Sequence, residues 1–519
     1  MTTFNQDNTP NAPVPKENND SGKPKKNESQ EELITGSIGK LLLKYTLPTL
    51  FAMMVSAIYT VIDSVFIGKY STASLSSVSV FMILEMLITL VAQGFCGSGG
   101  TLLAKASGAN DKEGMHISIA VTIKILLVFS ILVTGILLPF IEPIVVLFGA
   151  RNELKQDAVD YGKIILAGGP IAYSGLLFVT FMIRTLGKPG VSMLFAIASS
   201  LLNIGGDAIL IFSCGLGVKG AAYSTLISQI VIVPFGMWYL LKKCDISLKW
   251  RHFFRWDGDV AGKIVLLSLA SSFPGTLWNV VNIMINNQIH HYADPDDVTL
   301  VLAVIAITSR LTTFVLIGVQ AMAMAGGIIW SSNLGARLYS RIKKAVLDVC
   351  LVQWIVCMIG WIIFQLFPSI FLKMFADKDD IDAIVVIGKT PFKIMMGAMF
   401  VRFGSLTAVF MYQSLIRPLV GICMALIRRV VLYMGLISIL PGFMGLDGVY
   451  WTFPIADVIS CIIGIILIVV GMSKLPEDGK PNSDWDFMVC KCSTKEEIIF
   501  DEESSKDGIE MKEIVTSSV

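Results

Sequence analysis

The sequence predicts an all-α polytopic membrane protein with twelve transmembrane helices in two pseudo-symmetric six-helix lobes. Three observations lead to this fold class. The chain of 519 residues is 54% hydrophobic and only 16% charged, which is too apolar for a surface that faces water. Apolar stretches of membrane-spanning length recur twelve times. The second half of the chain also repeats motifs of the first half.

Each predicted span is about 20 residues or longer, which is enough to cross a hydrocarbon core of about 30 Å at about 1.5 Å per helical residue. Several spans contain Pro or Gly, which a membrane helix tolerates when its neighbours satisfy the freed backbone groups. The predicted spans are 41–67, 75–104, 117–140, 159–186, 190–214, 218–242, 262–290, 298–330, 345–368, 383–415, 418–442 and 447–472.

Lysine and arginine in the connections predict the orientation, because short cytoplasmic loops are enriched in these residues. Two short connections predicted to lie outside contain one base each, Lys69 and Lys219. Both termini are therefore expected in the cytoplasm. The connections predicted to lie inside are richer, with Lys105, Lys112, Arg184, Lys188, Lys242, Lys243, Lys249, Arg251, Arg255, Arg337, Arg341, Lys343 and Lys344.

The same topology divides the chain into five parts. The first tail is polar and nearly free of large apolar residues, which is typical of disorder. The linker between the halves is basic and aromatic, which favours the inner membrane surface. The predicted parts are a disordered cytoplasmic tail over 1–38, an amino-terminal lobe over 39–242, a cytoplasmic linker over 243–261, a carboxyl-terminal lobe over 262–473 and a cytoplasmic tail over 474–519.

Several glycine and proline motifs recur at an offset of about 226 residues, which indicates an internal duplication. Six spans per repeat is an even number, so both halves enter the membrane from the same side. The halves are then expected to be related by a pseudo-two-fold axis along the membrane normal, with a cavity between them. The paired motifs are Gly99-Gly100 with Gly326-Gly327, Gly108 with Gly335, Gly162-Lys163 with Gly388-Lys389, Pro48 with Pro274, and Gly220 with Gly448.

Acidic residues inside the spans are the strongest functional candidates, because a carboxylate in the bilayer costs several kcal/mol unless it is hydrated or paired. Asp63 is expected roughly 9 Å below the outer end of its helix, and Asp207 roughly 12 Å below. Asn203 shares a helix face with Asp207. Thr225 reaches a similar depth from the sixth span.

Two carboxylates, an amide and a hydroxyl at one level supply hard oxygen ligands. Such a group can hold Na⁺ or share a proton, since two neighbouring carboxylates are costly when both are ionised. The alternative is that Asp63 and Asp207 are each solvated in a wet cavity or paired with a base. The predicted cation-coupling residues are therefore Asp63, Asn203, Asp207 and Thr225.

Four further polar residues are secondary candidates for lining a cavity. Glu85 lies in the middle of the second span, where it either faces the cavity or pairs with a base such as Lys124. Asp457 lies ten residues into the twelfth span and has a structural alternative, an ion pair with Arg428 or Arg429. The secondary candidates are Glu85, Gln93, Asn282 and Asp457.

Composition argues against several other classes of protein. A net charge of +1 leaves no basic surplus for nucleic acid. The four histidines show no metal-ligand spacing and the cysteines imply no disulfide framework. Neither an enzyme nor a bound cofactor is expected, and no metal beyond Na⁺ is predicted. A channel would need a filter-like loop, which the sequence does not show.

Several motifs together resemble the multidrug and toxic compound extrusion (MATE) transporters, over about residues 40–473. They are Pro48, Asp63-Ser64-Val65-Phe66-Ile67-Gly68, the glycine-rich second span running into Ser107-Gly108-Ala109, Asn203-Ile204-Gly205-Gly206-Asp207 and Gly220-Ala221-Ala222-Tyr223-Ser224-Thr225.

This resemblance implies a two-lobed antiporter that exports organic cations and other drugs in exchange for H⁺ or Na⁺. In DinF-like members, positions matching Asp63, Asn203, Asp207 and Thr225 form the cation site of the amino lobe. NorM-like members have a further acidic site in the carboxyl lobe, but the seventh span here offers only asparagines and the tenth contains Arg402. Carrying Asn203, Asp207 and Thr225 through the repeat leads to or near Arg429, Tyr433 and Phe453, none of which is an acid.

The function expected from these observations is secondary active efflux of drugs by alternating access. The alternative is a flippase for a lipid-linked oligosaccharide or related amphiphile, because related two-lobed folds also move such lipids. A wide basic cavity would favour the flippase. The expected partners are small-molecule drugs or organic cations and the lipid bilayer, and the expected form is a monomer in the plasma membrane.

Overall fold

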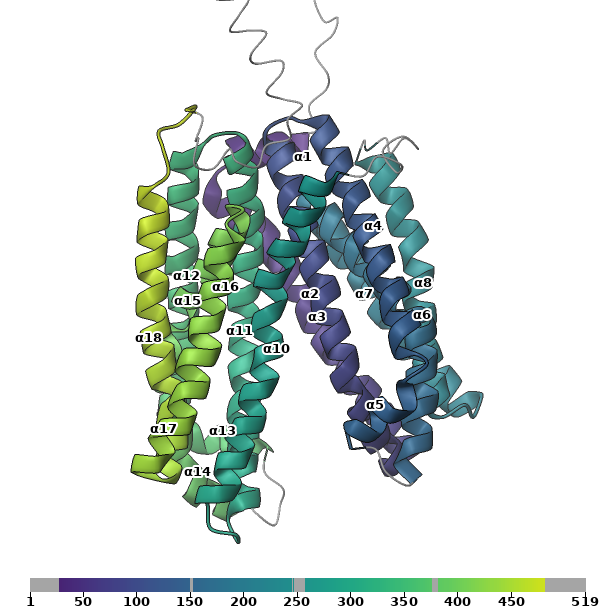
Figure 1. The fold of residues 1–519 in the computed structure, drawn as a ribbon, viewed down its shortest axis with the longest axis vertical. Helices are drawn as coiled ribbons and strands as arrows, with labels where there is room; N and C mark the ends of the chain where they lie inside the picture. The colour runs from purple at the N-terminus through teal and green to yellow at the C-terminus, as the bar shows by residue number, and fades with distance from the viewer. Residues whose placement is uncertain (1–27, 150–152, 245, 247–256, 376–380, 481–519) are drawn as a thin grey trace, which may run out of the picture.

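The computed structural model describes residues 28–149, 153–244, 246, 257–375 and 381–480. Within these ranges all regular secondary structure is helical and no strand occurs. The two predicted tails lie mostly outside the described residues, as does most of the predicted linker over 243–261. Figure 1 shows the helices running roughly side by side along the long axis of the molecule.

The first half of the chain forms a group of helices that we call the amino lobe, α2 to α8. The short helix α1 (Glu28–Thr35) precedes it. The lobe contains α2 (Ile38–Tyr70), α3 (Thr72–Gly108), α4 (Lys112–Leu137), α5 (Ile141–Leu147), α6 (Glu153–Thr185), α7 (Pro189–Asp207), the π-helix η1 (Ala208–Ser213) and α8 (Val218–Lys243).

The second half forms the carboxyl lobe, α10 to α18. It contains α10 (Gly258–Tyr292), α11 (Val298–Gly335), α12 (Tyr339–Leu366), α13 (Pro368–Phe375), α14 (Ile381–Met395), the 3₁₀ turn η2 (Met399–Val401), α15 (Phe403–Ser414), α16 (Pro418–Leu426), the π-helix η3 (Ile427–Met434), α17 (Gly435–Met444) and α18 (Leu446–Ser473).

Twelve helices in the described residues are long and apolar enough to cross a membrane, which confirms the predicted number of spans. The tenth differs from its prediction, because 383–415 is not one helix but α14 and α15 separated by η2. Side chains of α12 compensate for the break: Trp361 Nε1 donates to Gly397 O at 2.8 Å and Gln365 Nε2 donates to Lys393 O at 2.9 Å. These donors satisfy carbonyls that the interrupted helix leaves without an intrahelical partner.

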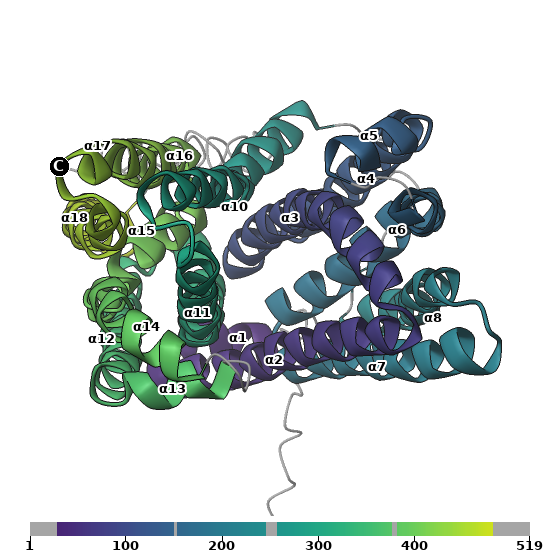
Figure 2. The ribbon, with the colours of Figure 1, turned by 90° about the horizontal axis from the view of Figure 1, so that it is seen from below.

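The two lobes contact each other through a few long helices. α3 packs against α10 and α11, and α2 packs against α11, while α3 also packs against α4 and α6 of its own lobe. In Figure 1 the two groups of helices are closest at the end where α1 lies and spread apart toward the end that carries α5, α13 and α14. Figure 2 shows α2, α3, α10 and α11 at the centre, between the outer helices of each lobe.

The backbone repeats the duplication seen in the sequence. Asn110 and Arg337, which are 227 positions apart, both have a left-handed backbone, with φ of 58° and 57°. The contacts between lobes are also reciprocal. A Cβ on Gly108 would lie 1.8 Å from Ser332 O, and a Cβ on Gly335 would lie 1.9 Å from Lys105 O. A pseudo-two-fold axis therefore passes between the ends of α3 and α11, where only glycine lets the two helices approach so closely.

Both described ends of the chain lie at this same end of the molecule. Asn333 Nδ2 donates to Leu33 O at 3.3 Å, and Arg341 Nη2 donates to Gly36 O at 2.6 Å. At the other end of the chain, Asp478 accepts hydrogen bonds from the amide and hydroxyl of Ser340, in the first turn of α12. These bonds hold the pKa of the Asp478 carboxyl below its ordinary range, and its negative charge suits a helix amino terminus.

Helix α1 is expected to depend on Leu33, which is 1% exposed in the apolar cluster that joins α1 to α3 and α11. Leu33→Asp should undock α1, because losing a buried leucine costs about 2–5 kcal/mol and a short helix has few other contacts to offset it. Hydrogen exchange of residues 28–36 should then become fast. The control Thr35→Asp, at an exposed position, should leave it slow; equal exchange in both variants would contradict the prediction.

Candidate functional site

Two buried carboxyl groups form the centre of the candidate site in the amino lobe. Asp63 on α2 is 6% exposed and Asp207 at the end of α7 is fully buried. Their side chains lie close enough to interact directly. Both oxygens of Asp207 and Oδ1 of Asp63 are nevertheless buried without a hydrogen-bond donor. Since an ionised carboxylate only accepts hydrogen bonds, this pair needs a proton or a cation to satisfy its oxygens.

The local sequence explains how α7 brings Asp207 to this position. Asp207 is the last residue of α7, and the π-helix η1 begins directly after it. π-helical turns are rare and are often found at functional sites. Gly206 also lets α8 approach, because a Cβ there would lie 2.5 Å from Ser224 Oγ. Ser224 Oγ donates to Asn203 O at 2.7 Å, which fastens α8 to α7.

Asn203 and Thr225 complete the group predicted from the sequence. Asn203 is 3% exposed, and its Nδ2 donates to Thr225 Oγ1 at 3.2 Å. With its amide hydrogens so directed, Asn203 Oδ1 faces no donor and is buried. The described residues contain no group of three or more His, Cys, Asp or Glu side chains that could hold a metal ion. Two carboxylates with an amide and a hydroxyl oxygen suit a proton or Na⁺.

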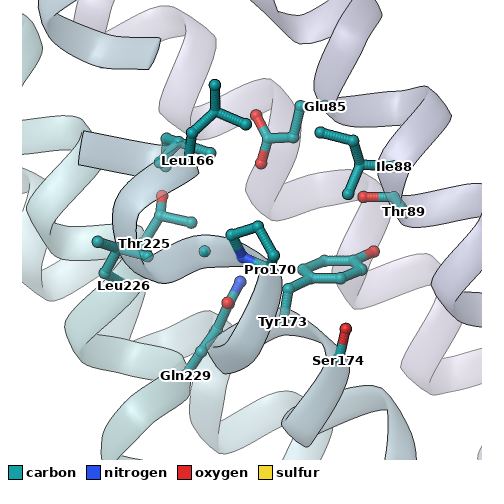
Figure 3. A pocket seen from close by; sticks show the side chains of 12 residues that line it. Glu85, Ile88, Thr89, Leu166, Pro170, Tyr173, Ser174, Thr225, Leu226 and Gln229 are labelled. Atoms are coloured by element: carbon teal, nitrogen blue, oxygen red, sulfur yellow. The ribbon is translucent and has the colours of Figure 1, made fainter. Parts of the chain in front are cut away.

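Two adjoining cavities lie beside these residues and share Tyr173, Thr225 and Gln229 in their walls. One is partly open, has an empty volume of about 390 Å³ and is lined by Glu85. Figure 3 shows the Glu85 carboxylate pointing into this cavity from α3, across from Pro170 and Gln229. The other is also partly open, has an empty volume of about 590 Å³ and is lined by Tyr59, Ser199, Ser200 and Asn203.

The sequence did not single out three residues of these walls. Tyr59 and Gln229 each lie four positions from a predicted site residue, Asp63 and Thr225, and so share its helix face. Tyr173 lies on α6 and lines both cavities. Helical spacing could have indicated the first two, whereas Tyr173 is placed only by packing of α6 against α3 and α8.

The secondary candidates fall in different places. Glu85 lines the first cavity. Gln93 on α3 and Asn282 on α10 are partly buried, on two helices that pack against each other between the lobes. Asp457 on α18 takes the structural role, as a buried ion pair with Arg402 and Arg428. Of the two bases predicted as its partner, Arg428 is the one that binds it.

The fold and the site define a class of protein, a polytopic helical transporter with two lobes and a polar site inside one of them. The MatE family profile matches residues 48–209, which include Asp63, Asn203 and Asp207. This match, together with the relatives and the solved structure below, supports a MATE family transporter. Assignment to its DinF-like branch stays a prediction that rests on the residues matching the amino-lobe site.

Named relatives and a solved structure agree with this assignment. The chain is 24% identical to the multidrug export protein MepA of Staphylococcus aureus over 447 residues, which cover 85% of this chain and 95% of the relative. MepA of Staphylococcus saprophyticus is likewise 24% identical and is covered over 96% of its length. A structure described as the outward-facing conformation of a multidrug resistance MATE family transporter superposes with a TM-score of 0.80, at 22% identity, over 88% of this chain and all of that one.

Proposed function

We propose that the protein is a secondary active multidrug efflux antiporter, which exports organic cations and other xenobiotics in exchange for H⁺ or Na⁺. One observation carries the proposal: Asp63 and Asp207 lie together, buried, with three oxygens that have no donor. Asn203 and Thr225 of the same predicted group line a cavity between the helices of the amino lobe. Such a pair of carboxylates is stabilised by a cation and therefore couples cation binding to the state of the cavity.

The mechanism we propose is alternating access of the two lobes. A cation entering from outside neutralises the Asp63 and Asp207 pair and displaces the drug from the cavity beside it. The lobes then rock so that the contact between α3 and α11 separates and the cavity reloads from the cytoplasm. The reciprocal close approach at Gly108 and Gly335 supports a contact that keeps the lobes together at this end of the molecule.

The relatives support export of drugs in particular. The curated relatives cited above are named multidrug export proteins, and they give the flippase alternative no support. We further propose that the protein acts as a monomer in the plasma membrane with both termini in the cytoplasm. The described ends of the chain, which lie at one end of the molecule, are consistent with that orientation.

Counterflow of a fluorescent organic cation in proteoliposomes tests the coupling. An outward-directed drug flux should appear when a pH gradient or a sodium gradient is imposed alone, and the gradient that works identifies the coupling ion. The same liposomes with both gradients collapsed provide the control. A flux that responds to neither gradient would show that the protein is not an antiporter of this kind.

A further inference from the structure

The carboxyl lobe contains a cluster of charged residues that the cation-coupling site does not use. Arg402, Arg428 and Arg429 lie in it with a single carboxylate, Asp457. Asp457 is 2% exposed and accepts hydrogen bonds from Arg402 Nε, from Arg428 Nη2 at 3.2 Å and from the Tyr433 hydroxyl at 2.8 Å. Arg428 Nη1 also donates to Ser405 Oγ at 2.9 Å. The carboxylate is therefore fully engaged by two of the three arginines.

Arg429 is the third arginine and has no ion pair or hydrogen bond among the described residues. Its guanidinium carbon lies 4.4 Å from the centroid of the Trp278 ring and 5.6 Å from that of Tyr433. Its Nε is buried without an acceptor, as is the Nε of Arg428. Three guanidinium charges against one carboxylate leave an excess of two positive charges inside a lobe, which is unfavourable unless an anion compensates them.

The internal repeat shows which part of the amino lobe this cluster matches. Pro189 and Pro418 begin α7 and α16 and are 229 positions apart. Thr185 and Ser414 are separated by the same number, and each faces an equivalent glycine: a Cβ on Gly100 would lie 3.1 Å from Thr185 Oγ1, and a Cβ on Gly327 would lie 2.9 Å from Ser414 Oγ. The offset in these helices is therefore 229, which corrects the value of about 226 expected from the sequence. Asn203 and Asp207 then match Leu432 and Leu436 instead of Arg429 and Tyr433.

With the corrected offset, the charged cluster coincides with the walls of the amino-lobe cavities. Gly217 and Gly445 fix an offset of 228 for α8 and α18. The matched residues of the amino lobe all line the cavity of about 590 Å³, and they are Tyr173 for Arg402, Ser199 for Arg428, Ser200 for Arg429 and Gln229 for Asp457. The arginines thus occupy positions whose counterparts line a cavity in the amino lobe.

We propose that Arg429 binds the anion in an anion-binding site of the carboxyl lobe, and that this site takes the carboxylate of an aromatic substrate. A guanidinium stacked on an indole ring keeps its in-plane N–H groups free, and their fork matches a carboxylate. Three aromatic rings form a wall beside it, Trp278, Tyr433 and Phe453. The ring centroids lie 5.4 Å apart for Trp278 and Tyr433 and 6.1 Å apart for Tyr433 and Phe453, and both pairs meet edge to face. The proposal rests on the proposed function in one respect, that the bound molecule is a transported one.

The test compares two dyes that differ at one group. Rhodamine 110 carries an ionised benzoate at pH 7, and rhodamine 123 is its methyl ester and a cation only. Binding of each dye to the purified protein is measured by fluorescence anisotropy without any gradient. Arg429→Gln should lower the affinity for rhodamine 110 about 10- to 100-fold, because hydrogen bonds to a charged group are lost. The affinity for rhodamine 123 should change less than about twofold.

Two further variants separate a binding role from a structural one. Arg429→Lys keeps the charge but loses the planar fork, so rhodamine 110 should bind with intermediate affinity. Lys389→Gln removes an exposed cation of the same lobe, on α14, and should leave the affinity for both dyes unchanged. Without dye, Arg429→Gln should unfold at the same temperature as the wild type or higher, because it removes an unpaired charge.

The proposal would be overturned if rhodamine 110 failed to bind the wild type, if Arg429→Gln affected both dyes equally or neither, or if the variant unfolded at a clearly lower temperature. Because no gradient is needed, the outcome is independent of the coupling mechanism. If drug flux in liposomes responded to no gradient but Arg429→Gln still weakened binding of rhodamine 110 alone, the antiporter would be rejected and the anion site would remain supported.

Discussion

Asp207→Asn is expected to abolish gradient-driven export while leaving the fold intact. An amide of the same size has no titratable proton and no negative charge to balance Na⁺. Cation binding therefore no longer changes the relative free energies of the conformational states. Both carboxylate oxygens of Asp207 are buried without a donor, so neutralising them removes an unfavourable term. We therefore expect flux in proteoliposomes to fall at least about tenfold, with a thermal midpoint equal to that of the wild type or higher.

The chain offers a matched control for this variant. Asp160 on α6 is also an aspartate of the amino lobe, but it pairs with Lys219 at 3.2 Å and is partly exposed. A partly exposed ion pair contributes little, so Asp160→Asn should change flux by less than about twofold. Export by Asp207→Asn at the wild-type rate under either gradient would remove Asp207 from the coupling site. A large fall in its thermal midpoint would mean that the side chain is structural instead.

The spans could be predicted because membrane length and hydropathy constrain a helix through its own residues alone. Twelve helices of membrane-spanning length and hydropathy occur in the described residues, although the tenth ends earlier than expected. The break between α14 and α15 could not be predicted, because it depends on Trp361 and Gln365 of α12 as donors to the freed carbonyls. That interaction joins helices whose relative placement no local pattern encodes.

The candidate site was predictable to the extent that depth along a helix is predictable. Counting residues from the helix ends placed Asp63, Asp207 and Thr225 at similar levels, and the structure brings the two aspartates together. That α2 packs on α7, so that the carboxyls face each other, comes from packing alone. The repeat was found from the sequence, but its offset drifts from 227 at Asn110 and Arg337 to 229 at Pro189 and Pro418. A single offset therefore misplaced the counterparts of Asn203 and Asp207.

The same limitation applies to Asp457. Charge and depth predicted a partner on the eleventh span, and Arg428 is that partner. Its other partner, Arg402, follows directly after η2 at the break in the tenth span. Since the break was not predictable, neither was the second ion pair. The excess charge on Arg429 emerges only once both partners of Asp457 are known.

Gly335→Ala is the second variant for which we expect a large effect. Alanine is normally better than glycine in a helix by about 1 kcal/mol, so helix propensity alone favours the change. At this position, however, the added Cβ would lie 1.9 Å from Lys105 O, a backbone atom of the other lobe, and 2.9 Å from Ala109 N. The clash can be relieved only by separating the ends of α3 and α11. Because this separation is part of the proposed rocking motion, the variant should favour the state in which these ends are apart.

Hydrogen exchange measures this shift directly. In the wild type, amides at the ends of α3 and α11, residues 105–110 and 332–338, should be protected; in Gly335→Ala they should exchange at least about tenfold faster, and drug flux should fall with them. Gly190→Ala is the matched control, since Gly190 lies in α7 with nothing within 4 Å of the added Cβ. That variant should keep both protection and flux. Shifting a two-state equilibrium from 1:99 to 99:1 needs about 5.5 kcal/mol. A clash with rigid backbone supplies an energy of this order only if the ends of α3 and α11 are in contact in the wild type. Unchanged protection in Gly335→Ala would contradict the proposal that the contact between α3 and α11 opens in the transport cycle.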